Sequence, residues 1–277
     1  MIAHSFPFAL VFARKSAHYS HSSKGNFSRA VNLRLSDSQP INTCEFRDED
    51  VVVALGQDGL VANTAMYVGS QPIVAINPEP TRFDGILLPF EAGEAKRVVA
   101  KVIDGTAAIR EITLAEVQLS DSQRLLAFND FFIGARSHIS AQYRIEHNKR
   151  SEIQSSSGVL ISTGAGSTGW MSSVFNMAAG VAKFCGGASG RAVRLPWDDR
   201  HLLYVVREPF VSRHSQASIV AGMLGQEEEL VLESLMPTAG VIFSDGIESD
   251  FLQFNSGSIA RVHAGAQTAH LVVGGKQ

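Results

Sequence analysis

The apolar residues of this chain fall into short runs that follow two different patterns. Val51–Leu55 and Pro72–Ile76 are continuous apolar runs, which are typical of strands buried on both faces. Between Glu91 and Ile103 the apolar residues recur at helical spacing, which predicts a helix. Phe8–Phe12 fits a further parallel strand, and Ile86–Leu88 another strand. Strands that alternate with helices predict a parallel sheet.

The pattern changes after Gly105, where apolar and polar residues begin to alternate. Turn residues separate the strand-like runs, which are Glu111–Leu119, Arg124–Phe128, Ala141–Glu146, Val159–Ser162, Leu202–Arg207, Leu230–Glu233, Val241–Ser244, Ala260–His263 and His270–Val273. One helix interrupts them, starting near Ser167 and running to about Gly180. We therefore predict an α/β N-terminal domain with a Rossmann-like parallel sheet, residues 1–104, and a β-rich antiparallel, sandwich-like domain, residues 105–277.

Composition and charge exclude several classes of function. The chain has 277 residues, 24 Lys and Arg against 27 Asp and Glu, and a net charge of -3, so nothing favours nucleic-acid binding. No apolar run is long enough to span a bilayer, and we expect no membrane partner. The cysteines, Cys44 and Cys185, fit two reduced thiols. No Cys and His residues have the spacing of metal ligands, so no protein metal site is predicted.

The N-terminal stretch allows two interpretations. Residues 1–36 contain no Asp or Glu but several basic residues and serines, which resembles an organellar leader. The alternative, which we favour, is a first strand followed by elements that complete the domain, with a weakly patterned helix and strand between Asn26 and Glu45. We therefore expect a cytoplasmic protein, with a mitochondrial location as the alternative.

The most informative motif follows the buried run at Val51–Leu55. Gly56, Gln57, Asp58 and Gly59 lie between this strand and a helix-compatible segment. A strand, a glycine turn and a helix present backbone N–H groups to a phosphate, and the two glycines allow positive φ. Asp58 would lie at the carboxyl end of the strand, where open α/β sheets bind ligands. The structural alternative is an ordinary turn in which Asp58 caps the next helix.

Two further motifs place polar residues beside apolar strands. Asn129 and Asp130 interrupt an apolar strand pattern, and they are either a bulge or turn or a pair that binds ligand hydroxyls and amides. Thr163–Gly169 is a loop of small residues between a strand and a helix, which Ser167 or Thr168 could cap. We favour phosphate or ribose binding there, because the loop has more small residues than a cap requires.

A fourth motif, Asp245-Gly246 after an apolar strand, is the usual signal of a hairpin turn. Asp245 could nevertheless reach a ligand. Taken in order, the motifs resemble those of the NAD kinases, in the superfamily of diacylglycerol and sphingosine kinases. The resemblance covers about residues 46–273, is nearest to the mitochondrial-type enzymes and to bacterial relatives labelled sugar kinases, and rests on GQDG, INPEP, NDFFIG, STGAGSTGW, VVREPF and FSDGI.

The resemblance implies an enzyme that uses ATP and Mg²⁺, or another divalent cation, to phosphorylate the 2′-hydroxyl of the adenosine ribose of NAD. Asp58 would then be the catalytic residue that accepts the hydroxyl proton. Most of the Mg²⁺ ligands would be ATP oxygens. The residues that the resemblance assigns to binding are Gly56, Gln57 and Gly59 for ATP, and Asn129, Asp130, Thr168, Gly169, Trp170 and Ser173 for NAD, with Ser157, Thr163, Ser167 and Asp245 as further candidates.

Several positions depart from the family pattern. Gln57 replaces a glycine, Leu60 replaces a threonine, Gly164 replaces a proline and Ser157 stands where many members have Asp. Two alternatives therefore stay open: a kinase of the same fold with a sugar, nucleoside or lipid acceptor, and a non-catalytic sensor of NAD(P) or ATP. The family resemblance and exposed β-edges also predict a homodimer or homotetramer.

Overall fold

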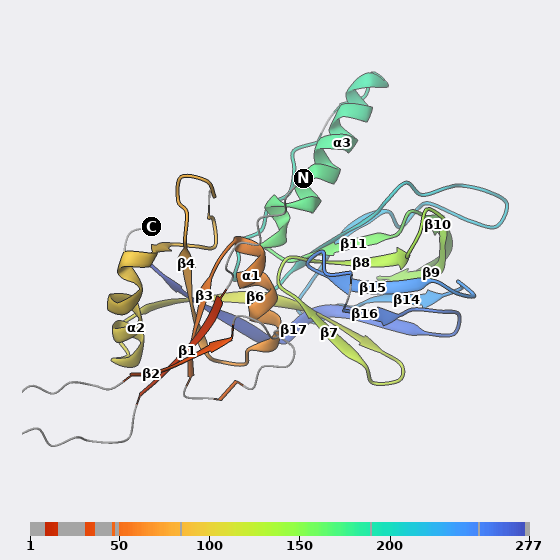
Figure 1. Cartoon of the computed structure of the whole chain (residues 1–277). Coiled ribbons are helices and arrows are strands. Elements are labelled where there is room, and N and C mark those ends of the chain that lie inside the picture. Colours follow the sequence, from red (N-terminus) through yellow and green to blue (C-terminus); the bar gives the residue numbers. More distant parts are fainter. Residues whose placement is uncertain are drawn as a thin grey trace, which may run out of the picture. The chain divides into compact units, whose positions relative to one another are not determined.

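The chain divides into two compact units. The computed structural model describes residues 9–15, 31–36, 46–47, 50–83, 85–188, 190–248 and 250–274, and for the first two of these ranges only the backbone. The first unit comprises Met1–Glu111 with Gln267–Gln277, and the second comprises Ile112–Ala266. Two long strands, β6 (Ala108–Leu119) and β17 (Ile259–Val273), belong to both (Figure 1). The predicted boundary was Gly105, and the return of the chain to the first unit was not predicted.

The first unit is built on a mixed sheet. Its strands lie in the order β17-β4-β3-β1-β2, and β5 also pairs with β4. The pairings among β17, β4, β3 and β5 are parallel, whereas β1 is antiparallel to both of its neighbours. The strands are β1 (Ala9–Lys15), β2 (Val31–Ser36), β3 (Asp50–Leu55), β4 (Pro72–Asn77) and β5 (Phe90–Glu91).

Our prediction of a parallel first strand was wrong in its direction. An apolar run shows that a strand is buried but not which way it runs, because direction depends on the connections to its neighbours. The strand expected between Asn26 and Glu45 is present as β2, whereas the helix expected there and the N-terminal leader fall largely outside the described residues.

Two helices accompany this sheet. α1 (Asp58–Tyr67) follows β3, and α2 (Ala95–Ile103) follows a 3₁₀ turn, η2 (Ala92–Glu94). Val51 and Val53 of β3 pack in one cluster with Val98 of α2. Val52 and Ala54 are fully buried on the opposite face of the strand, where α1 lies (Figure 1). The continuous apolar run of β3 is therefore explained by burial on both sides of the sheet.

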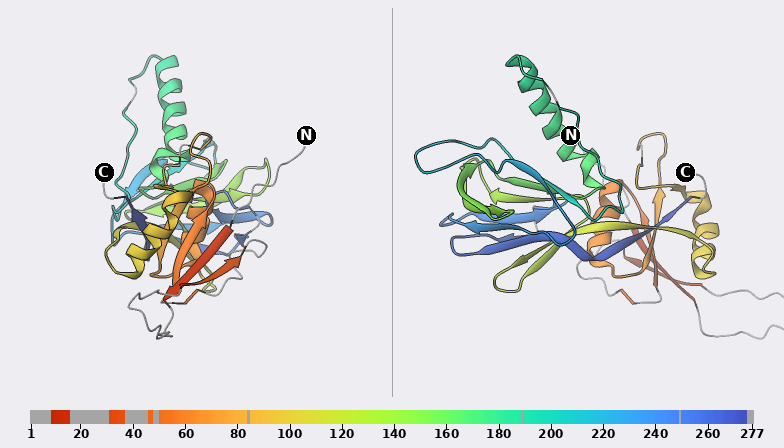
Figure 2. Two further views of the ribbon diagram at one scale, coloured as in Figure 1. Left: turned by 60° about the vertical axis from the view of Figure 1, so that its left-hand side comes forward. Right: turned by 180° about the vertical axis from the view of Figure 1, so that it is seen from behind.

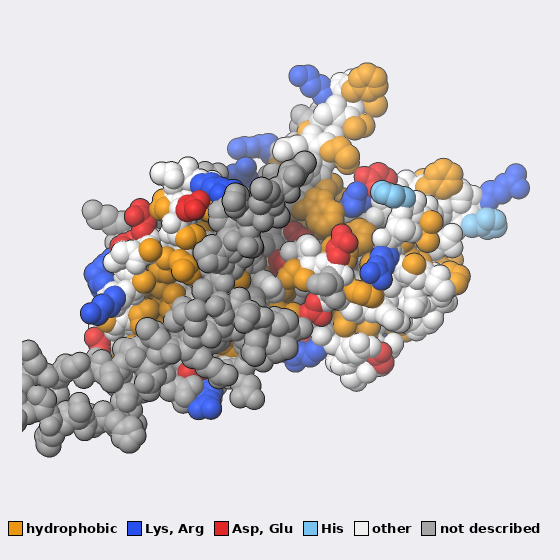
Figure 3. All heavy atoms as spheres, viewed as in Figure 1, with side chains coloured by type: hydrophobic (Ala, Val, Ile, Leu, Met, Phe, Trp, Pro, Cys, Tyr) orange, Lys and Arg blue, Asp and Glu red, His pale blue; other side chains and the backbone are white. Residues whose placement is uncertain are grey.

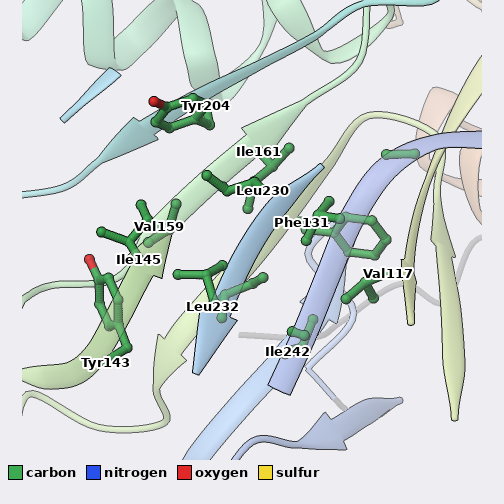
Figure 4. Packing of buried hydrophobic residues seen from close by; sticks show 14 of the residues in the cluster. Val117, Phe131, Tyr143, Ile145, Val159, Ile161, Tyr204, Leu230, Leu232 and Ile242 are labelled. Atoms are coloured by element: carbon green, nitrogen blue, oxygen red, sulfur yellow. The ribbon is translucent and has the colours of Figure 1, made fainter. Parts of the chain in front are cut away.

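The second unit contains two antiparallel sheets. One has the order β13-β12-β11-β8-β15-β16; in the other, β10-β9-β14-β17 is extended by β6 and β7. Figure 4 shows the apolar side chains packed in this unit. The strands are β7 (Arg124–Ala127), β8 (Asp130–Ala135), β9 (Ala141–His147), β10 (Arg150–Ser156), β11 (Val159–Ser162), β12 (Leu202–Val206), β13 (Ala221–Leu224), β14 (Leu230–Ser234), β15 (Gly240–Ser244) and β16 (Phe251–Gln253).

Three strands of this unit, β10, β13 and β16, were not predicted. β10 has the sequence RSEIQSS, in which the inward-facing positions are polar. Glu152 and Gln154 are buried there, and they bond to each other and to the backbone of Ile219. Because the buried positions of β10 carry polar side chains that are hydrogen-bonded, its sequence lacks the alternation of apolar and polar residues by which a strand is predicted. The two strands predicted within residues 260–273 are a single long strand, β17.

A helix covers part of the outer face of the six-stranded sheet. α3 (Trp170–Phe184) follows the 3₁₀ turn η3 (Gly166–Thr168) and buries Met171 and Val174 against Leu160 and Leu203. The outer half of α3 projects from the strands (Figure 2) and leaves apolar side chains exposed, as Figure 3 shows. Phe184 near its end is 91% exposed. Within the described residues, no helix has the length and apolarity that a membrane crossing requires.

Candidate active site

The GQDG motif joins β3 directly to α1. Gly56 is buried and Gln57 is the N-cap of α1, but the Gln57 side chain makes no capping bond. The helix begins at Asp58, and Gly59 lies in its first turn. Neither glycine has a positive φ, so the conformational freedom suggested by the sequence is not used. The N–H groups of the first turn of α1 are thus left without a side-chain cap, which is the arrangement that favours an anion.

Asp58 does not cap its own helix. Its Oδ1 atom accepts a hydrogen bond of 2.7 Å from the backbone N–H of Leu87, 29 residues further along the chain. The side chain is half-buried, and within the described part of the protein this is its one hydrogen bond. The bond orients the carboxylate and leaves Oδ2 available to a ligand.

The segment around Leu87 is a turn, and our prediction of a strand at Ile86–Leu88 was wrong. Gly85 has a φ of +61°, and the N–H of Leu88 bonds to the Gly85 carbonyl. Asn77 organises the preceding loop, because its side chain accepts from the N–H of Glu79 and donates to the carbonyl of Phe83. Three apolar residues suggested a strand, but the left-handed glycine before them reverses the chain.

In the second unit, Asn129 and Asp130 lie at the start of β8, and Asp245 fixes the backbone there. The Asp245 carboxylate accepts bonds from the N–H groups of Phe128 at 2.8 Å and Asn129 at 2.6 Å. Its own N–H donates to the Asp130 carbonyl. Asp245 and Gly246 have φ of 52° and 73° and form the predicted Asp-Gly turn between β15 and β16. Asp245 therefore positions the strand that carries the candidate binding residues.

Burial gives Asp130 and Asp245 unusual acidities. The Asp130 side chain belongs to a residue only 8% exposed, and burial, with a smaller contribution from the charge of Asp245, raises its pKa to about 7. Burial also raises the pKa of Asp245 to about 6, although the backbone N–H groups oppose this rise. No described group donates a hydrogen bond to the Asp130 carboxylate. Of the two carboxyls, Asp130 has the pKa that is raised further, because no hydrogen bond from a described group opposes the effect of its burial.

The raised pKa of Asp130 predicts that the second unit loses stability as pH rises. A carboxyl with a pKa of about 7 when folded and about 3.9 when unfolded binds more protons in the native state between these values. The contribution of Asp130 to the free energy of unfolding should therefore fall by about 2.5 kcal/mol from pH 5 to pH 8. Urea unfolding followed by tryptophan emission measures this, since Trp170 and Trp197, the two tryptophans of the chain, belong to this unit.

Asp130→Asn is the matched variant, because it removes the titrating group and keeps its shape. Its free energy of unfolding should vary less with pH than that of the wild type, whatever the histidines contribute to both. Parallel pH profiles for the two proteins would show that Asp130 does not titrate in this range.

The loop at residues 163–169 packs against the backbone of Asn129. The Thr163 hydroxyl donates to the Phe128 carbonyl at 2.6 Å, and the Thr163 N–H donates to the Asn129 carbonyl at 2.9 Å. The Ser167 hydroxyl donates to the Gly164 carbonyl at 2.7 Å and accepts from the N–H of Leu195. Thr163 and Ser167 are buried, and their hydroxyls bond to backbone carbonyls. These two candidates therefore fix the conformation of the loop.

The remaining candidates of this loop lie near the start of α3. Thr168 and Gly169 are exposed, and Gly169 is the N-cap of α3 without a side-chain cap. The predicted capping by Ser167 or Thr168 is therefore wrong. Ser173 is exposed on the first turn of the helix. Trp170, the first residue of α3, points its ring toward Phe132 of β8, with centroids 6.0 Å apart and planes 12° apart.

A cavity of about 510 Å³ opens on the outer face of the six-stranded sheet. It is lined by aromatic rings and guanidinium groups, including those of Phe132, Trp170, Phe243, Arg136 and Arg207, and also by Ser157. The Arg207 guanidinium lies 5.4 Å from the centre of the Trp170 ring. Ser157 is exposed, and its N–H bonds to the Arg207 carbonyl.

The cavity and Asp130 lie on the same face of β8. Side chains alternate along a strand, and Phe131 and Ile133 point into the core of the unit. Asp130 and Phe132 therefore share the opposite face, with their Cα atoms about 7 Å apart. Asp130 thus lies on the face of β8 that bears the cavity, and two other predicted residues, Trp170 and Ser157, line the cavity itself.

Of the residues that line this cavity, sequence reasoning predicted only Ser157 and Trp170. Phe132, Arg136, Arg207 and Phe243 are among those that it missed. The available signal was an arginine directly after an apolar strand, which occurs at both Arg136 and Arg207. The two phenylalanines were taken as parts of continuous apolar strands. Only the strand register shows that they face away from the core.

The architecture combines an α/β unit, whose GQDG loop leads into α1, with a β-rich unit whose strand β8 begins at the Asn129-Asp130 pair. The structure is similar to a crystal structure of yeast NADH kinase complexed with NADH, with a TM-score of 0.58, 22% identity, and coverage of 80% of this chain and 61% of that chain. This likeness shows the fold, and the predicted NAD kinase-like fold class is confirmed.

Sequence comparison points to the same family. One relative is named "Probable NADH kinase" from Oryza sativa subsp. japonica, 24% identical over 224 residues, which are 72% of this chain and 63% of that protein. Another is an NAD kinase from Chlorobium phaeobacteroides (strain BS1), 28% identical over 144 residues, 50% of this chain and 49% of that protein. The chain therefore spans less than two thirds of either relative. No family model matches it. Together these findings support the NAD kinase family, as the motifs predicted.

Proposed function

We propose that this protein transfers the γ-phosphate of ATP to the 2′-hydroxyl of the adenosine ribose of NAD or NADH. The observation that carries the proposal is the placement of Asp58. Its carboxylate lies at the junction of β3 and α1, beside a helix N-terminus without a side-chain cap, and one of its oxygens is fixed by Leu87. A base and an anion site side by side are what phosphate transfer to an alcohol requires.

The chemical step follows from these positions. The 2′-oxygen attacks the γ-phosphorus, the new oxygen–phosphorus bond forms, and the bond to the β-phosphate oxygen breaks to release ADP. Asp58 accepts the hydroxyl proton. The N–H groups at the start of α1 would bind phosphate oxygens, with Gly56, Gln57 and Gly59 shaping this turn.

The second unit would bind the acceptor. Asn129 supplies a donor and an acceptor, and Asp130 supplies a buried carboxyl that no described group satisfies. Ligand hydroxyls are suitable partners for it, because a buried carboxyl without a hydrogen bond is destabilising. Thr168, Gly169 and Ser173 are exposed near the start of α3, where they are accessible to the same ligand.

A divalent cation would accompany the nucleotide. Among the residues that the structure describes, no three His, Cys, Asp or Glu side chains lie together as a metal site. Mg²⁺ in such enzymes takes most of its ligands from phosphates and water, so ATP oxygens would supply most of the ligands here. When bound, the cation neutralises charge on the phosphates. The homo-oligomer and the cytoplasmic location remain predictions from the sequence.

An endpoint assay tests the proposal. Purified protein is incubated with ATP, Mg²⁺ and either NAD or NADH, and the phosphorylated product is read with an NADP-specific dehydrogenase. Product formation supports the kinase. If no product forms but the dinucleotide raises the melting temperature, the sensor alternative is favoured. If neither signal appears, a screen of sugar, nucleoside and lipid head-group acceptors tests the alternative kinase.

A further inference from the structure

β4 ends beside the GQDG motif, in the INPEP segment, to which no role in the reaction has been assigned. β3 and β4 are parallel neighbours in which Leu55 pairs with Ile76, and the N–H of Gly56 bonds to the Ile76 carbonyl at 3.2 Å. The last residue of β4, Asn77, is only 5% exposed. A buried amide side chain requires hydrogen-bond partners, and these partners indicate what the residue does.

The Asn77 side chain is bonded at both ends of its amide. Its Oδ1 atom accepts from the N–H of Glu79 at 3.0 Å, and its Nδ2 atom donates to the Phe83 carbonyl at 3.1 Å. The chain turns between these two points, because the N–H groups of Arg82 and Phe83 bond to the Glu79 carbonyl. One buried amide therefore ties both ends of this turn to the end of β4.

The same amide packs against the next turn, at Gly85. A Cβ atom added at Gly85 would lie 2.6 Å from Asn77 Nδ2 and 3.2 Å from the Cβ atom of Leu88. The contact is possible because Gly85 has no side chain, and its φ of +61° is one that other residues rarely adopt. A bond of 2.9 Å from the Leu88 N–H to the Gly85 carbonyl closes this turn. Asn77 thus supports the turn at residues 85–88 by direct contact.

The turn at residues 85–88 places the N–H of Leu87 against Asp58. The side chains of Leu87 and Leu88 are buried and anchor the turn, and Phe90 beyond it pairs with β4. Asp58 Oδ1 accepts from the Leu87 N–H at 2.7 Å, its one hydrogen bond within the described part of the protein. The direction of this carboxylate therefore depends on the position of a single backbone N–H group.

We propose that Asn77 is a positioning residue for Asp58: it fixes the turn at residues 85–88, and through the Leu87 N–H it fixes the direction of the Asp58 carboxylate. This inference rests on the proposed function, because it takes Asp58 as the group that accepts the hydroxyl proton. A displacement of about 1 Å at a reacting group can lower a rate by about 10²-fold. Asn77 acts through the turn and the N–H group rather than on the substrate.

Asn77→Ala tests the proposal, because it removes both hydrogen bonds of the amide and its contact with Gly85. We expect kcat to fall by about 10- to 100-fold, while the KM for the dinucleotide changes by less than about threefold. Asn176→Ala is the matched control, since Asn176 is exposed on α3 in the second unit. It should keep the wild-type kcat. Thermal unfolding shows whether each variant is folded.

A double-mutant cycle with Asp58→Asn separates positioning from a general structural role. If Asn77 acts through the Asp58 carboxylate, Asn77→Ala should lower the residual rate of Asp58→Asn by less than about twofold, because the group that it positions no longer accepts a proton. An equal fold-loss in both backgrounds would overturn the proposal. A single Asn77→Ala variant whose kcat stays within about twofold of the wild type would do the same.

Hydrogen exchange provides a measurement that does not depend on activity. We expect the Leu87 amide, followed by NMR, to exchange at least about tenfold faster in Asn77→Ala and in Asp58→Ala than in the wild type, while the amides of β3 exchange at the same rate. This result in a protein that forms no phosphorylated product would support the positioning of Asp58 and refute the kinase. Unchanged exchange of Leu87 alongside product formation would leave the kinase and refute the positioning.

Discussion

Asp58→Asn is expected to lower kcat by about 10²- to 10⁴-fold while dinucleotide affinity changes little. The variant keeps an oxygen that can accept the bond from the Leu87 N–H, so the turn that holds the side chain remains in place. What it removes is the capacity to accept the proton of the attacking hydroxyl. Initial rates with ATP and each dinucleotide, together with NADH binding, separate these two effects.

A surface carboxylate serves as the control for this variant. Asp198 is exposed and belongs to the second unit, and Asp198→Asn makes the same chemical change outside the unit that carries the GQDG motif. It should keep the wild-type rate. An Asp58→Asn protein that retained more than about a tenth of the activity would show that another group, or water, takes the proton.

Gly166→Ala is expected to destabilise the second unit by about 3 kcal/mol, which corresponds to a fall of about 10 °C in melting temperature. A Cβ atom at Gly166 would lie 2.1 Å from the carbonyl oxygen of Asn129 and 2.6 Å from the Ser162 hydroxyl. The first of these is a backbone atom at the start of β8, so relief of the clash must move the strand that carries Asp130. Thermal unfolding followed by tryptophan emission measures the loss.

Gly180→Ala provides the matched comparison. Gly180 lies in α3, and a Cβ atom there would meet nothing within 4 Å. Because alanine is the better helix former, this variant should be more stable by about 0.5 to 1 kcal/mol. If Gly166→Ala were as stable as Gly180→Ala, the tight packing of the loop against Asn129 would be contradicted.

The sequence predicted the parts of the fold in which local pattern and burial agree. β3 and β4 carry continuous apolar residues because both faces of the strands are covered, and α2 carries the helical spacing that its single buried face requires. The prediction failed where other interactions decide the structure. Ile86–Leu88 is a turn because Gly85 has a left-handed backbone conformation. β10 is a strand because its buried polar side chains are hydrogen-bonded to the neighbouring backbone.

The candidate site was predictable as a set of polar and small residues at strand ends. Asp58, Asn129 and Asp130 stood out because polar residues beside buried strands need a reason to be there. The sequence did not show which of the polar residues hold the backbone in place and which remain available to a ligand. The sequence alone could not show that the Asp245 carboxylate accepts a bond from the Phe128 N–H, or that the Thr163 hydroxyl donates to the Phe128 carbonyl. In each pair the two residues are more than 30 positions apart along the chain.

The pairing of β4 with β17, which are far apart along the chain, has a consequence during synthesis on the ribosome. β4 pairs with β17 at Pro72 and Ile73, and the neighbouring carbonyl of Ser70 bonds to His270, 200 residues later. At about 5 to 20 residues per second, that partner emerges about 10 to 40 s after β4. During this interval the apolar edge of β4 is open to other chains. A nascent form of this protein should therefore be a client of chaperones until the whole second unit has been made.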